Sequence, residues 1–142
     1  MAAFDQLDLL DVPYLDDTLR WINSNSREWK ALQKLMLDIV HEEPWRKRVK
    51  RDEICAEARK RGISIDLSGA WEFDHNLWSV LARYLIKYHP QLDGKNGGII
   101  HVRKSNNGEP LPDISWFPEL NPKLVVTEEE YQIHRFWRER NN

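Results

Sequence analysis

The fold depends most on the stretch DHNLWSVLARYLIKYHP, which occupies residues 74–90. Asp74 can cap the first helical turn, and Pro90 lies just past the last one. Between them, large apolar side chains recur at the three- and four-residue spacing of one helix face. These side chains are Leu77, Trp78, Leu81, Leu85 and Tyr88. The stretch therefore predicts a helix from Asp74 to about His89 with one face in the core.

The same kind of pattern predicts four further helices. They cover residues 14–23, 27–42, 52–61 and 128–140. The helix at 27–42 has the longest apolar stripe, and Pro44 ends it. Gly62 stops the helix at 52–61, and Thr127 with Glu130 matches a capping box that opens the last helix.

The pattern becomes alternating near residue 99. Residues 99–104 and 114–117 are predicted strands, and the turn formers at 105–110 lie between them. This order predicts an antiparallel hairpin. The predicted fold class is therefore mainly α with a small antiparallel β hairpin, that is, α+β.

Charge is distributed unevenly along the 142 residues. Residues 45–104 hold 13 Lys or Arg and 7 Asp or Glu, so the net charge of −2 conceals a basic middle between acidic ends. Five of the six residues at 46–51 are basic. Such a run can mark an anion-binding surface, and ordinary surface variation is the alternative explanation.

Three parts of the chain can be separated on these patterns, although no repeat or flexible linker divides them. They are an acidic N-terminal arm with a short helix (1–25), a body (26–118), and a linker with the C-terminal helix (119–142). The length of the chain fits one domain.

Motifs for catalysis or metal binding do not occur in the sequence. No two of the five histidines have the HxxxH spacing, and Cys55 is the single cysteine. We therefore expect a non-enzymatic protein with no metal and no cofactor. No apolar run approaches the roughly 18 residues of a membrane span, and the N-terminus lacks a basic signal region, so we expect a cytoplasmic location without membrane contact.

The order of elements in the body resembles a winged helix-turn-helix. The resemblance covers about residues 26–118 and is carried by Lys50-Arg51-Asp52-Glu53-Ile54, Leu77-Trp78-Ser79-Val80-Leu81-Ala82-Arg83-Tyr84-Leu85 and Ile99-Ile100-His101-Val102-Arg103-Lys104. It is an architectural likeness, without the signature of a specific family. It implies a winged-helix-like body with extra N- and C-terminal helices. It also implies that the helix at 74–89 lies in the major groove of DNA and that the hairpin touches phosphate.

Candidate nucleic-acid-binding residues follow from this likeness and from the charge pattern. They are Arg46, Lys47, Arg48, Lys50 and Arg51 on the basic run, Asn76, Ser79, Arg83 and Lys87 on the helix at 74–89, and Arg103 and Lys104 on the predicted hairpin. Asn and Arg suit base edges, and Lys and Arg neutralise phosphates. The first expectation for function is therefore a protein that binds duplex DNA, regulates transcription or is accessory to a nucleic-acid machine.

A protein–protein interaction module on the same scaffold is the alternative. Tyr131, Phe136 and Trp137 on the C-terminal helix are the candidate partner-binding residues, because aromatic side chains beside Arg are typical of interfaces. Such a module could be a small effector or adaptor, for example of phage or mobile-element type, and the terminal helices could form a homodimer. Binding of RNA, with Trp45 stacking on unpaired bases, is the third hypothesis.

Overall fold

A computed structural model describes residues 15–65, 74–102, 105–106, 109–110, 114 and 117–141, with the backbone alone for 74–77, 105–106 and 109–110. The α-helices are α2 (Leu15–Ser24), α3 (Ser26–Glu42), α4 (Ile54–Lys60), α6 (Asp74–Tyr88) and α7 (Glu128–Arg140). Single 3₁₀ turns are η1 (Arg51–Glu53), η2 (Pro90–Leu92), η3 (Gly94–Asn96) and η5 (Pro122–Leu124). The five predicted helices are confirmed, with ends that differ by two residues at most.

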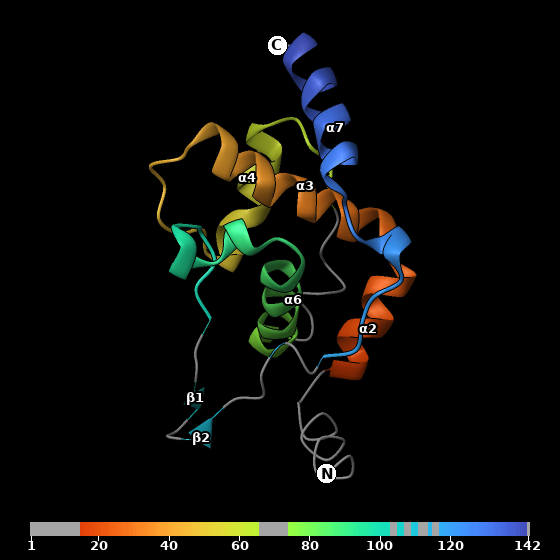
Figure 1. The fold of residues 1–142 in the computed structure, drawn as a ribbon, viewed down its shortest axis with the longest axis vertical. Helices are drawn as coiled ribbons and strands as arrows, with labels where there is room; N and C mark the ends of the chain where they lie inside the picture. Colours follow the sequence, from red (N-terminus) through yellow and green to blue (C-terminus); the bar gives the residue numbers. More distant parts are fainter. Residues whose placement is uncertain are drawn as a thin grey trace.

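Helix α6 lies at the centre of the molecule, with α2 packed beside it and α3 crossing above it in the view of Figure 1. Its residues 80–86 are all buried, the polar Arg83 included. Other parts of the chain must therefore pack on every side of this part of α6. Part of that cover is the segment at 117–120, where the Tyr84 hydroxyl donates to the Pro118 carbonyl oxygen over 2.9 Å. The predicted single buried face therefore describes α6 incompletely.

A buried amide in α3 joins three distant segments. The Gln33 Nε2 donates to the Leu124 carbonyl oxygen over 2.8 Å, and the Gln33 Oε1 accepts from the Val126 amide over 3.0 Å. The same oxygen lies 2.8 Å from the His89 Nε2, which must therefore be the donor. Burial lowers the pKa of His89 to about 4, so its imidazole is neutral near pH 7.

Helix α7 starts beside the middle of α3 and rises toward the C-terminus at the top of Figure 1. The Thr127 Oγ1 accepts from the Glu130 amide over 3.1 Å, which confirms the predicted N-cap. The Glu130 carboxylate instead pairs with Lys30 over 2.8 Å and with Lys34 over 3.4 Å. The side chain expected to complete the capping box therefore ties α7 to α3.

The predicted hairpin is wrong. Residues 99–102 are irregular apart from one isolated parallel bridge between Ile100 and Asp93, and Ile114 lies in a 3₁₀ turn. Antiparallel pairing in the described chain is confined to two residues on each side, β1 (Ser105–Asn106) and β2 (Glu109–Pro110), inside the stretch predicted to be the turn.

Local hydrogen bonds explain this difference. The Ile100 amide donates to the Leu92 carbonyl oxygen, and the Ile100 carbonyl oxygen accepts from the Gly94 amide. Ile99, Ile100 and Phe117 are buried, and they pack in the helical core. The fold class is corrected to mainly helical, without the predicted hairpin and hence without a wing. Residues 103–104 lie outside the described part of the chain.

One apolar cluster unites the described helices, with members from α2, α3, α4, α6, the segment 92–126 and Tyr131 of α7. The core thus draws on all three predicted parts of the chain. None of the described helices is both long and apolar enough to cross a membrane.

Candidate functional site

The basic segment, residues 46–51, crosses the surface between α3 and η1. Val49 fixes it, because its side chain is buried and its amide donates to the Ile99 carbonyl oxygen over 3.1 Å. The Lys47 carbonyl oxygen lies 2.8 Å from the His101 Nε2. The segment is therefore held at two backbone points while its charged side chains take different directions.

Arg46 points into the protein. Its guanidinium lies 2.6 Å from Glu57, 2.7 Å from Glu53 and 3.5 Å from Glu43. Burial by itself lowers the pKa of Arg46, but the hydrogen bond from its guanidinium to Glu57 and the neighbouring negative charges raise it above its ordinary value. Arg61 reaches the same glutamates Glu43 and Glu57. Arg46 therefore links α3 to η1 and α4 in the structure, and its contact with nucleic acid stays a prediction.

Lys47, Arg48 and Lys50 are exposed. None of the three forms an ion pair with an acidic side chain among the described residues, whereas Arg51 lies 3.2 Å from Asp52. Trp45, just before the segment, is 72% exposed. The run of five cations thus divides into two that are paired with acidic groups and three that face solvent.

A hollow of about 220 Å³ borders this segment. It is lined by Arg48, Val49, Lys50, Arg51, Asp52, Trp78, Ile100 and His101. The lining thus contains one aromatic side chain (Trp78), three cations, one histidine and a single acidic residue (Asp52). This lining suits an anion with a flat or apolar neighbour, such as a phosphate next to a base.

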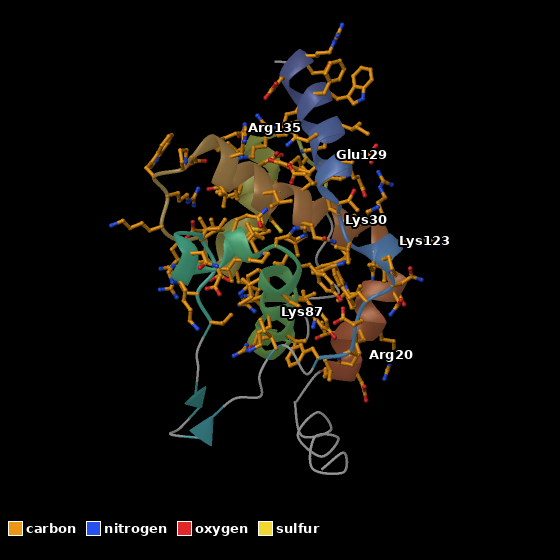
Figure 2. All side chains as sticks on the ribbon, viewed as in Figure 1. Arg20, Lys30, Lys87, Lys123, Glu129 and Arg135 are labelled. Atoms are coloured by element: carbon orange, nitrogen blue, oxygen red, sulfur yellow. The ribbon has the colours of Figure 1, made fainter. Side chains whose placement is uncertain are left out.

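The described side chains of the predicted reading helix are engaged inside the protein. Arg83 is 7% exposed, and its Nη1 donates to the Ser79 carbonyl oxygen over 2.9 Å. Lys87 lies 3.1 Å from Glu119 on the segment that covers α6 (Figure 2). Ser79, Arg83 and Lys87 therefore form contacts within the protein, and their contacts with DNA stay a prediction. The side chains of Asn76, Arg103 and Lys104 lie outside the described residues.

The predicted partner-binding residues on α7 separate into an inner and an outer side. Tyr131 is on the inner side, where it is buried and its hydroxyl donates to the Asp38 carboxylate over 2.9 Å, and its role in partner binding stays a prediction. Phe136 is 50% and Trp137 58% exposed. Ile133, which the prediction omitted, is 54% exposed beside them. Its spacing of three and four residues from the two aromatic residues is the sequence pattern that identifies it.

A partly buried ionic cluster joins α7 to α3 and was not predicted. It consists of Asp38, Glu42, Tyr131, His134, Arg135 and Arg138. The fully buried Asp38 lies 2.7 Å from the His134 Nε2 and 3.1 Å from the Arg135 guanidinium. Burial raises the pKa of Asp38, but hydrogen bonds from His134, Tyr131 and Arg135 outweigh that effect and hold it below its ordinary value.

Glu42 extends the ionic cluster toward the end of α7. Its carboxylate lies 2.7 Å from the Arg138 Nε and 2.6 Å from the Arg135 guanidinium. Burial raises the pKa of Glu42, and these two arginines outweigh it and lower the pKa to about 2. The sequence offered one clue to this contact, the two arginines spaced three residues apart on α7.

The described residues form no group of His, Cys, Asp or Glu suited to a metal ion. The fold and these contacts describe a helical protein with a basic surface after α3 and an apolar surface on α7. No protein-family model, curated protein or solved structure matches the chain.

Proposed function

We propose that the protein is a non-enzymatic DNA-binding protein that holds the phosphate backbone of the duplex through its basic segment. The observation that supports this proposal is that Lys47, Arg48 and Lys50 are exposed together and beside a hollow lined by cations. Exposed Lys and Arg side chains gain most from phosphate contacts, because binding releases counterions from the DNA.

Backbone contacts without base reading suit an accessory role. Arg83, the arginine suited to guanine, is buried in α6. Contacts to phosphate position a protein but carry little sequence information. We therefore expect similar affinity for duplexes of different sequence.

Fluorescence anisotropy with a labelled random duplex tests this proposal. Three phosphate contacts predict that affinity falls about 40-fold between roughly 50 and 200 mM salt. The double variant R48E/K50E should weaken binding at least about tenfold at the lower salt. Arg46 is left intact, because its substitution would disturb the contact between α3 and α4.

A matched control is the double variant R20E/K123E, which makes the same change in net charge at two other exposed positions (Figure 2). It should bind duplex nearly as the parent does. Equal losses in both variants would mean that net charge, and not this surface, governs binding. No binding by the parent at either salt, or unchanged binding by R48E/K50E, contradicts the proposal. Preference for single-stranded RNA over duplex would instead support stacking on Trp45.

A second candidate function is a protein-interaction module that uses α7. The observation in its favour is that three large apolar side chains, Ile133, Phe136 and Trp137, are each at least half exposed on one helix. Contiguous exposed apolar residues often mark interfaces.

A further inference from the structure

The outer face of α7 consists of Glu129, Ile133, Phe136, Trp137 and Arg140. All five are exposed. Glu129, Ile133, Phe136 and Arg140 follow one another at spacings of four, three and four residues, so they form one stripe along the helix. Trp137 flanks this stripe and packs edge-to-face on Phe136, with ring centroids 5.4 Å apart.

The opposite side of α7 is already occupied. Tyr131 and Arg135 are the buried residues of the helix, and both contact Asp38 of α3. Figure 2 shows Arg135 on the side of α7 toward the body and Glu129 on the other side. The outer face is therefore directed away from the protein's own core. It does not pack on α3 and is accessible to another molecule.

The order of residues in the stripe is self-complementary. Consider a two-fold axis perpendicular to α7, at the level between His134 and Arg135. This axis would set Ile133 level with Phe136 of a second copy. The same axis would set Glu129 level with Arg140 of the second copy. Apolar side chains then meet at the centre, and opposite charges meet at both ends. A parallel arrangement would instead place Glu129 against Glu129 and Arg140 against Arg140.

We propose that a second copy of this chain binds the outer face of α7, so that two α7 helices pair antiparallel in a symmetric dimer. The charge pattern selects this occupant, because α7 carries three acidic residues in its first turn and two basic residues in its last. The Arg140 guanidinium lies 5.1 Å from the Phe136 ring centroid, next to the apolar centre of the pair. This inference rests on the second candidate function, with the partner now specified, and is independent of the basic segment.

Exchanging the charges at the two ends gives a direct test by sedimentation equilibrium. The parent should dimerise with a Kd in the micromolar range, because a single helix pair buries a small area. E129R alone should raise the Kd at least about tenfold, since it places a second guanidinium against Arg140 of the other copy. R140E alone should raise it to a similar extent by opposing Glu129 with a second carboxylate.

An equimolar mixture of the two variants should restore the dimer as a heterodimer with affinity near that of the parent. In the heterodimer, the arginine introduced by E129R faces the glutamate introduced by R140E at one end. At the other end, the native Arg140 faces the native Glu129, so both ends pair opposite charges. This recovery cannot arise from a change in helix stability, because each variant would still carry its own substitution. Circular dichroism of each single variant checks that α7 remains folded.

The apolar centre and the specificity of the surface need one further pair of variants. F136A should weaken the dimer, and W45A, which removes an even more exposed aromatic side chain outside α7, should leave it unchanged. A parent that stays monomeric to about 200 μM contradicts the proposal. A dimer that E129R and R140E do not weaken, or a mixture that does not recover, contradicts the antiparallel register. Duplex binding measured on the same variants shows separately whether the basic segment works as proposed.

Discussion

The ionic cluster between α3 and α7 and the basic segment that follows α3 use the same residue types with opposite results. In the ionic cluster, Arg135 and Arg138 meet Asp38 and Glu42, and all four charges are at least partly removed from solvent. In the basic segment, Lys47, Arg48 and Lys50 face solvent without an acidic partner among the described residues. Whether a cation stabilises the fold or remains available to a ligand is decided by the acidic groups that tertiary packing brings to it.

The largest effect should follow from removing the centre of the ionic cluster. D38A removes the acceptor of the Tyr131 hydroxyl and the carboxylate beside His134, and it leaves Glu42 as the closest carboxylate of Arg135. We expect the free energy of unfolding to fall by about 3–5 kcal/mol, because Arg135 and Arg138 then share the Glu42 carboxylate and the cluster keeps an excess of positive charge. Urea denaturation followed by circular dichroism measures this change. A loss below about 1 kcal/mol would mean that the ionic cluster contributes little to the fold.

Mild acid should also destabilise the protein, through His89. Its pKa is about 4 in the folded state and near 6.5 when exposed, so the unfolded chain binds a proton that the folded chain does not. Stability should therefore fall as pH drops from 6.5 to 4, by up to about 3 kcal/mol. The variant H89Q removes the titrating group and should flatten this part of the profile. Equal slopes for parent and variant would show that His89 is not responsible.

Neighbouring cations of the basic segment should differ in how much they contribute to the free energy of unfolding. R46A breaks contacts with Glu53 and Glu57 and should cost about 2 kcal/mol. K47A removes an exposed cation and should change stability by less than about 0.5 kcal/mol. Thermal unfolding of the two variants under the same buffer compares them directly. Equal losses would remove the distinction between the structural and the exposed cations.

A smaller loss than that of R46A is expected at the start of α7. T127A removes the hydroxyl that accepts the Glu130 amide and should cost about 1 kcal/mol. T127S keeps an N-cap hydroxyl and should recover most of that loss. Urea denaturation of both variants tests whether the cap or the ionic cluster does more to fix α7.

Local sequence patterns were sufficient to predict the helices and most of their ends. Pro44, Gly62 and Thr127 act on the residues next to them, so the ends of α3, α4 and α7 could be predicted without knowledge of the tertiary structure. Gly62 illustrates this point, because its φ of 70° is a left-handed conformation that glycine adopts most readily.

The hairpin and the direction of single charges could not be predicted in this way. Ile99 and Ile100 would be equally apolar in a strand and in a loop that buries them against helices, and the second case holds. Arg46 and Lys47 are adjacent cations, and only the tertiary positions of Glu53 and Glu57 turn one of them inward. Tyr131 and Phe136 are both aromatic, and the sequence of α7 alone does not say which of them meets Asp38.

The attachment of α7 has a consequence for the order in which the protein opens. Only Tyr131 and Arg135 of this helix are buried, so charges and hydrogen bonds hold it to α3 more than apolar contact does. A change that disrupts these charges weakens that attachment without removing the apolar contacts around α6. We expect α7 to detach first, as a separate unit of local unfolding, and its amides to exchange with solvent before those of α6.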